Sequence, residues 1–360
     1  MLISMFSKSL TIRSGFLVLC LELLLTSAAS ASCIGLGGDE RLQNYCLLNA
    51  IDGKAIDHRT AKMVDSRLRR AGSSTGLGFP RVVAFESSSM SFSVRPLLSY
   101  EANINGGNPD KPLMIGNLTF NGDEALYKTS GAVAGLGAIL SGRTIYGEDK
   151  YLNYNFDTSY ALSSSIDDRI ATTSASVCSL NHIANSWYID ACANQSRMRK
   201  TLSDSSSSNL KLMAAYIFTS ATKEHSQVKF GVNRFFADSY TQNQLFLGID
   251  TLHPSSVFTG VEATFGEAIP EQLATRISVS GRVGLQVAGK PLTINASFSN
   301  ATGGLLFGVD RDAKSASVSA SYPVWRNFNV TMGYTKTDSA IDYFDLASPI
   351  LGIEFVPIKF

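Results

Sequence analysis

Long stretches of strict alternation between apolar and polar residues constrain this chain more than any other feature. In LTINASFS (292–299) each apolar residue is followed by a threonine, asparagine or serine. RISVSGRVGLQV (276–287) and NFNVTMGYT (327–335) repeat the pattern. Successive side chains of a β-strand point to opposite faces, so each stretch predicts a strand with one apolar and one polar face.

The length of these strands favours a membrane barrel over a soluble sandwich. They run on the order of 10–16 residues, whereas strands of globular proteins have about 5–6 and strands that cross a bilayer need about 9–11. A closed barrel leaves no unpaired edge in hydrocarbon, with apolar residues toward lipid and polar residues toward the lumen. We therefore expect an all-β fold, an antiparallel outer-membrane β-barrel of about 14 strands over residues 88–360; twelve or sixteen strands remain alternatives.

The connections between these strands alternate in length. The predicted strands are 88–104, 131–146, 150–165, 168–180, 186–200, 207–220, 225–238, 242–253, 256–268, 274–288, 291–303, 313–323, 327–338 and 349–360. Outer-membrane barrels have short periplasmic turns and longer outer loops. The shorter of the alternating connections are therefore expected at the periplasmic end of the barrel. The longest outer connection, 106–130, contains an apolar patch. It is expected either to fold into the lumen or to form an extra surface hairpin, and to gate the barrel or contact a substrate.

The N-terminus has the features of an export signal. Lys8 and Arg13 precede an apolar segment, and Ala29, Ser30 and Ala31 fit a small-residue cleavage site. The apolar core is shorter than the roughly 20 residues that span a bilayer, so we expect a cleaved signal peptide over 1–31 and export through the Sec pathway rather than a membrane anchor. Residues 32–87 predict a short periplasmic helical segment and linker.

Four cysteines follow the predicted cleavage site, an even number that suggests disulfides in an exported chain. Of three possible connectivities, proximity favours Cys33–Cys46 and Cys178–Cys192. Cys178 and Cys192 flank a predicted turn and share the polar register of neighbouring strands, so a cross-strand disulfide that staples the hairpin is geometrically reasonable. Cys33 also admits a lipidation site as an alternative.

Charged residues in the polar register predict the lining of the lumen. They are Arg95, Glu101, Asp157, Asp190, Lys211, Lys229, Asp250, Glu262, Arg276 and Arg282. One interpretation is a polar conduit; the alternative is a closed interior filled by salt bridges. About fourteen strands are wide enough to enclose water unless the barrel is plugged, because the bore grows with strand number.

Several other functions are not expected. The net charge of +1 gives no electrostatic basis for binding nucleic acid. The four histidines are isolated in the sequence, so neither a metal or cofactor site nor a catalytic constellation is predicted.

Three stretches resemble a known family of barrels. They are SVRPLLSYEANINGG (93–107), PLMIGNLTFNGDEALYKTSGAVAGLGA (112–138) and MGYTKTDSAIDYFDLASPILGIEF (332–355). Together they are similar to the C-terminal barrel of the surface lipoprotein assembly modulator (Slam-like) proteins. The resemblance implies a fourteen-strand barrel that assists secreted or surface proteins across the outer membrane. Residues 32–80 are too short for two tetratricopeptide units of about 34 residues, the other part of that family.

The alternatives are a general or solute-selective porin and a structural or adhesive surface barrel. The chain ends GIEFVPIKF, in which Val356, Ile358 and Phe360 occupy alternate positions. We interpret these three residues as the signal that the barrel assembly machinery reads, on a strand that closes against 88–104. The expected partners are outer-membrane lipid, that machinery and a secreted or surface protein substrate.

Overall fold

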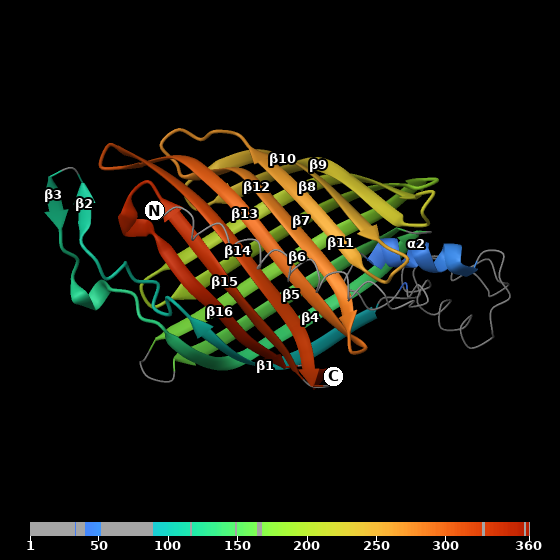
Figure 1. The fold of residues 1–360 in the computed structure, drawn as a ribbon, viewed down its shortest axis with the longest axis horizontal. Coiled ribbons are helices and arrows are strands. Elements are labelled where there is room, and N and C mark those ends of the chain that lie inside the picture. The colour runs from blue at the N-terminus through green and yellow to red at the C-terminus, as the bar shows by residue number, and fades with distance from the viewer. Residues whose placement is uncertain are drawn as a thin grey trace, which may run out of the picture.

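Fourteen long antiparallel strands close into one barrel in this computed structural model. The structure describes residues 33, 40–51, 89–115, 117–147, 150–163, 168–325, 328–355 and 358–359. Each barrel strand pairs with its neighbours along the chain, and the last long strand pairs with the first. The predicted fold class, an antiparallel β-barrel of about 14 strands, is therefore confirmed. Figure 1 shows the strands inclined to the long axis of the molecule.

The strands largely coincide with the predicted segments. They are β1 (Ser89–Glu101), β4 (Gly131–Gly147), β5 (Lys150–Ser163), β6 (Arg169–Ala184), β7 (Trp187–Lys200), β8 (Asp204–Thr219), β9 (His225–Ala237), β10 (Thr241–Leu252), β11 (Phe258–Gly266), β12 (Ala274–Val287), β13 (Lys290–Leu306), β14 (Val309–Trp325), β15 (Phe328–Ser339) and β16 (Leu346–Phe355). A two-residue strand, β17 (Ile358–Lys359), follows β16.

The seam of the barrel joins β1 to the C-terminal strands. Leu97 pairs with Glu354 and Tyr100 with Leu351, while β17 continues the seam through Val94 and Ile358. The predicted pairing of the C-terminal strand with 88–104 is thus confirmed, although its long part begins at Leu346 rather than 349.

Tight turns connect several strands. Ala288 and Gly289, between β12 and β13, both have positive φ (50° and 74°), which a type I′ hairpin turn requires. Phe307 and Gly308, between β13 and β14, also have positive φ (50° and 79°). The sequence predicted a long outer loop there, and this was wrong. The strands continue to pair, and a phenylalanine at positive φ is a poor turn signal in sequence.

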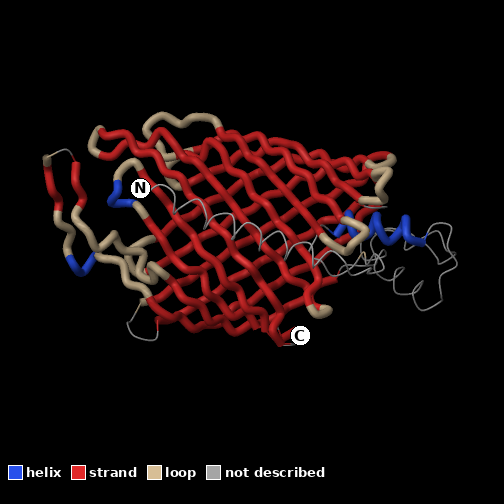
Figure 2. Tube along the Cα trace, viewed as in Figure 1, coloured by secondary structure: helices blue, strands red, loops and turns tan. Residues whose placement is uncertain are grey.

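The two ends of the barrel carry different additions (Figures 1 and 2). At one end the connection between β1 and β4 forms a small hairpin, β2 (Leu113–Ile115) and β3 (Leu118–Phe120), which projects beyond the barrel. Two 3₁₀ turns, η1 (Glu124–Leu126) and η2 (Asp342–Phe344), belong to the same end. At the opposite end, where most turns are short, lies the helix α2 (Glu40–Ile51).

The outer face of the barrel is apolar along the strands. Leu136, Leu245 and Met332 belong to the outward register and are 58–61% exposed. A depression of about 1070 Å³ on this face is lined by other apolar side chains of the same register, among them Val177 and Phe265. Continuous apolar side chains around a closed barrel are the arrangement that a hydrocarbon environment requires. None of the described helices is long and apolar enough to cross a membrane.

Candidate functional site

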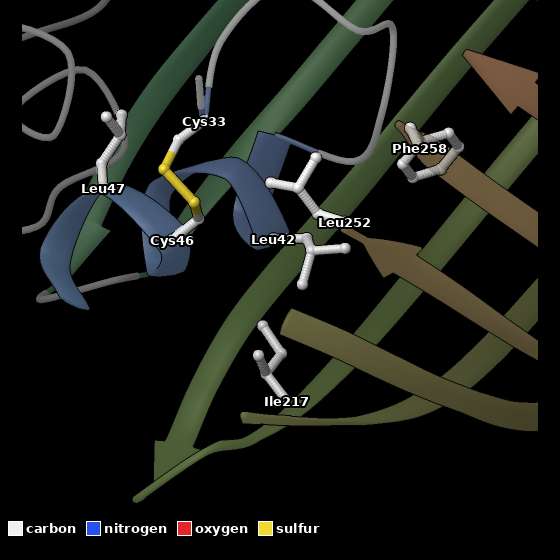
Figure 3. Close-up of a cluster of buried hydrophobic side chains, with 7 residues drawn as sticks. All are labelled: Cys33, Leu42, Cys46, Leu47, Ile217, Leu252 and Phe258. Carbon is white, nitrogen blue, oxygen red and sulfur yellow. A yellow bond between two sulfur atoms is a disulfide. The ribbon is translucent and has the colours of Figure 1, made fainter. Parts of the chain in front are cut away.

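Three apolar side chains interrupt the polar inward register at the end of the barrel that carries α2. Ile217 of β8, Leu252 of β10 and Phe258 of β11 are at most 4% exposed. We call these three residues the apolar seat. They pack in one cluster with Leu42 of α2, which is 1% exposed, and Figure 3 shows Leu42 directed toward them. The helix therefore covers the apolar seat. Without α2, these apolar side chains would be exposed to water at the mouth of the lumen.

A buried ion pair joins the same helix to the barrel. Nη1 and Nη2 of Arg41 donate to the two carboxylate oxygens of Asp190 on β7, at 3.0 and 2.8 Å. The side chains are only 8% and 3% exposed. The guanidinium also lies 4.1 Å from the centre of the Tyr188 ring, and the backbone N–H of Asn181 donates to Asp190 at 3.2 Å. The bidentate geometry and these further contacts offset the cost of burying two charges.

A second ion pair fixes the start of α2 to another part of the wall. Nη2 of Arg143, on β4, donates to a carboxylate oxygen of Glu40 at 2.6 Å, and its Nε donates to Asn153 at 2.7 Å. Glu40 is the first residue of the helix, where its carboxylate also interacts favourably with the positive end of the helix dipole. Two neighbouring residues of α2 with opposite charges thus bind two barrel residues with the opposite charges.

A disulfide between Cys33 and Cys46 links α2 to the residue Cys33 that precedes it in the chain. Both cysteines are 5% exposed and belong to the cluster around the apolar seat. A twelve-residue helix alone is marginal in water. The crosslink and the docked face therefore account for its order, and Tyr45 adds an edge contact to His225 at 5.8 Å between ring centroids.

A cavity of about 790 Å³ with a mixed polar and apolar lining lies inside the barrel next to α2. Its lining includes Glu40, Arg143 and Asp190, which form the two ion pairs, and inward residues such as Asn153 and Ser176. The second disulfide, Cys178–Cys192, lies in this lining and joins directly paired residues of β6 and β7. The cavity is large enough for a small polar solute and meets α2 at its charged first turn.

On the strands that follow, charges cross the inner wall as ion pairs. Nζ of Lys229 lies 2.7 Å from Asp250 on the next strand, with side chains 15% and 6% exposed. Nζ of Lys211 lies 3.7 Å from Glu262 and 3.7 Å from the centre of the Phe246 ring. We call the inward face of β7–β11 the charged wall. Each of these lysines is paired with a carboxylate on another strand, so the charged wall presents charges of both signs rather than one.

Another part of the lumen, which begins two strands further along the sheet from β11, is neutral. In segments 293–299, 315–321 and 331–337 the inward positions hold only serine, threonine, asparagine and glycine. We call the inward face of β13–β15 the hydroxyl wall. Cross-strand hydrogen bonds join Ser297 to Ser317 at 2.8 Å and Ser315 to Thr337 at 2.8 Å. These short side chains are partly exposed, and their hydroxyls can exchange hydrogen bonds with water or solute.

Arg95 connects charges across the barrel seam. Its guanidinium donates to Asp157 of β5 at 2.8 Å and to Glu354 of β16. The strand β4 lies between β1, which carries Arg95, and β5. Its Gly137 pairs with Arg95, and a Cβ on Gly137 would lie 3.2 Å from the Arg95 Nε. The glycine thus gives the arginine room to reach a strand on each side.

The other end of the barrel is narrowed by the base of the connection from β1 to β4. Ile104 is fully buried beside Val133, Ala161 and Ile170. The carbonyl of Asn105 accepts from the backbone N–H of Leu202 at 2.7 Å, which ties the connection across to the turn between β7 and β8. Of the two predicted arrangements for 106–130, the structure shows a surface hairpin, while the residues just before it partly cover the mouth.

A hydrogen-bonded clasp supports the rim near the apolar seat. The ring nitrogens of His253 lie 3.0 Å from Glu224 in the preceding turn and 3.0 Å from Thr259. The bond to His253 lowers the pKa of the Glu224 carboxyl below its usual value. Since the folded-state pKa is lowered, this clasp contributes stability at neutral pH that is lost as the pH falls through that pKa.

The structure brings most of the predicted lumenal charges together in pairs. The inward register contains Arg95, Glu101, Asp157, Asp190, Lys211, Lys229, Asp250, Glu262 and Arg282. Arg276 lies at a shift in register between Thr275 and Ile277, so the alternation does not place it. Among the expected assembly-signal residues, Ile358 is exposed, and Val356 and Phe360 lie outside the described residues.

The residues that sequence analysis missed are those that hold the helix. Glu40, Arg41 and Leu42 were included only in a helical segment, and Asp190 was assigned to the lumen without a partner. One signal was available. Ile217, Leu252 and Phe258 are apolar residues in the inward registers that also hold Lys211, Asp250 and Glu262, and large apolar side chains that face a lumen are expected to be covered.

Comparisons with known proteins concern the fold only. No protein-family model matches the chain, and no curated protein matches it. The high-pH structure of Pseudomonas putida OprB aligns at 7% identity with a TM-score of 0.43, covering 76% of this chain and 94% of that one. A BenF-like porin from Pseudomonas fluorescens Pf-5 aligns at 8% identity with a TM-score of 0.40, covering 77% and 100%.

Pseudomonas aeruginosa OccK2 (OpdF), solved in complex with glucuronate, aligns at 8% identity with a TM-score of 0.42, covering 77% of this chain and 99% of that one. At such values the similarities carry no argument about what this barrel transports. The barrel fold rests on the chain's own strand pairing, and the resemblance to Slam-like proteins remains a hypothesis without a family match.

Proposed function

We propose that this protein is an outer-membrane channel that admits small polar solutes, with α2 as a partial plug at its periplasmic mouth. The observation that carries the proposal is the inner surface. Charged and polar side chains of β4 to β7 belong to the lining of a cavity of about 790 Å³ beside α2, and the hydroxyl wall adds further polar side chains to the lumen. A barrel built only for structure would gain more from a tightly packed interior.

The orientation follows from the connections. The end that carries α2 has the short turns, which in outer-membrane barrels face the periplasm. The N-terminal segment would then remain on the periplasmic side after export through the Sec pathway and cleavage of residues 1–31, which lie outside the described part of the chain. Folding would proceed through the barrel assembly machinery, with Val356, Ile358 and Phe360 as the proposed signal.

Solute passage accounts for the lumen better than passage of a whole protein does. A folded or extended protein substrate would need the bore that α2 and the base of the β1–β4 connection partly occupy. Among the described residues, the contacts of α2 reported above are made with β4 to β11, and we infer a path between the helix and the hydroxyl wall. That path suits small solutes.

The test is electrical recording of the purified protein in planar lipid bilayers. We expect discrete conductance steps in potassium chloride, with little preference for cations or anions because the lumenal charges are paired. In parallel, vesicles containing the protein should swell in small neutral sugars. Absence of conductance from the wild type and from a variant whose α2 has been released would contradict the proposal.

A further inference from the structure

We propose that the part of the lumen occupied by Glu40, Arg41 and Leu42 is a binding site for short peptides, and that α2 occupies it as an internal competitor. The ligand class is a peptide with a carboxylate, a cationic side chain and an apolar side chain. This inference rests on the proposed function, because the solute must be able to enter the lumen.

The site is defined by what the first turn of α2 contacts. Arg143 on β4 binds the Glu40 carboxylate, Asp190 on β7 binds the Arg41 guanidinium, and the apolar seat receives Leu42. These three groups come from different strands and each is fixed by other contacts. Asn153 holds Arg143, and Asn181 donates to Asp190. A preorganised set of this kind loses little entropy when a ligand replaces the helix.

The barrel groups look excessive for a purely structural docking surface. A buried ion pair adds little stability over an apolar contact, because desolvation offsets the attraction. Such pairs are instead sensitive to the identity of the partner, since a ligand that lacks the charge leaves a buried charge unpaired. Asp190 and Arg143 also line the cavity of about 790 Å³, so the site is continuous with solute-accessible space.

The apolar seat and the Tyr188 ring restrict the ligand further. The ring lies 4.1 Å from the Arg41 guanidinium carbon and belongs to the same strand as Asp190. A flat guanidinium stacks on such a ring better than an ammonium does. We therefore expect arginine peptides to bind more tightly than lysine peptides, with leucine-sized side chains in the seat.

The experiment uses the full chain with α2 released. Arg41→Glu places a carboxylate against Asp190, and Leu42→Asp independently removes the contact with the seat. Neither changes the barrel. Release is measured as faster reduction of Cys33–Cys46, which is almost buried when docked. Calorimetry in detergent then follows binding of the capped tripeptide glutamyl-arginyl-leucine, with glutamyl-glutaminyl-leucine as the matched control.

Both released variants should bind the arginine peptide. The wild type should bind it at least about tenfold more weakly, because the peptide must first displace the docked helix. The glutamine peptide should bind to the released variants at least about tenfold more weakly than the arginine peptide. Adding Asp190→Asn to the Leu42→Asp variant should weaken binding of the arginine peptide by at least about the same factor. Equal binding of the two peptides, binding insensitive to Asp190→Asn, or a helix that stays docked in both variants would overturn the proposal.

Binding and conductance separate this inference from the proposed function. Peptide binding without any conductance would retain the site and remove the channel. Conductance from the released variants without selective peptide binding would retain the channel and remove the site.

Discussion

The charged wall and the hydroxyl wall line one lumen, with β12 between them, but they are built on different principles. On β7–β11, side chains such as Lys229 and Asp250 are long, charged and largely buried against one another. On β13–β15, side chains such as Ser297 and Ser317 are short, neutral and paired by hydroxyl hydrogen bonds. The helix α2 rests on the first side, through Asp190 and the apolar seat.

Under the proposed function, this difference allows one barrel both to hold α2 as a partial plug and to admit solutes. The charged wall and its neighbours provide partners that specify where α2 lies, because each buried charge demands a partner of opposite sign. The hydroxyl wall provides no such demand and leaves space. The proposed path for solutes is therefore off-centre, between α2 and the hydroxyl wall, and each wall can be altered separately.

The largest effect is expected from Arg41→Ala. This change leaves Asp190 buried without its guanidinium, a loss of about 3–5 kcal/mol that shifts the docking equilibrium by a factor of roughly 10² to 4 × 10³. Conductance in planar bilayers should rise, and Cys33–Cys46 should be reduced faster. Asn49→Ala on the exposed part of the same helix is the control. Unchanged conductance and reduction rate would show that the charged wall does not hold the helix.

A smaller effect is expected from Lys229→Met, within the charged wall itself. Asp250, which is 4% exposed, would lose its ammonium, at a cost of about 2–3 kcal/mol in the free energy of unfolding. Urea unfolding in detergent measures this cost, and selectivity should shift toward cations. Lys336→Met breaks the exposed pair with Asp338 and should change the free energy of unfolding much less, because exposed ion pairs contribute little. Equal losses in the two variants would contradict the comparison.

The two walls also differ in how well the sequence alone predicts them. The hydroxyl wall and the outer apolar face could be predicted because strand alternation is local: each residue of NFNVTMGYT has its face set by its neighbours in the chain. The seam between β1 and the C-terminal strands followed from closure, since an open edge is excluded in hydrocarbon.

The helix site could not be predicted because its contacts are long-range. Arg41 and Asp190 are 149 residues apart, and nothing in either local pattern indicates the other. Arg95 likewise bridges two strands that come close only after the barrel has closed. The turn at Phe307 and Gly308 was missed for another reason, since strand pairing outweighed the weak local preference of phenylalanine for positive φ.

Narrowing the hydroxyl wall should change conduction without changing docking. Ser319→Trp places a large side chain in the proposed path and should roughly halve the conductance, because conduction depends on pore diameter. Val318→Trp, the outward neighbour in the same strand, should leave conductance unchanged. Reduction of Cys33–Cys46 should be the same in both. If Ser319→Trp conducts like the wild type, the path does not run along this wall.

The smallest effect is expected from Ser317→Ala, which removes one hydroxyl from the ladder. Its hydrogen bond to Ser297 is 2.8 Å long and exposed to the lumen, so water can satisfy the remaining hydroxyl. The loss in unfolding free energy should be at most about 0.5–1 kcal/mol, well below that of Lys229→Met, and conductance should not fall. A loss of the size expected for Lys229→Met would mean that the hydroxyls are as poorly hydrated as the buried charges. The two walls would then not differ in access to water, and the solute path would have to lie elsewhere.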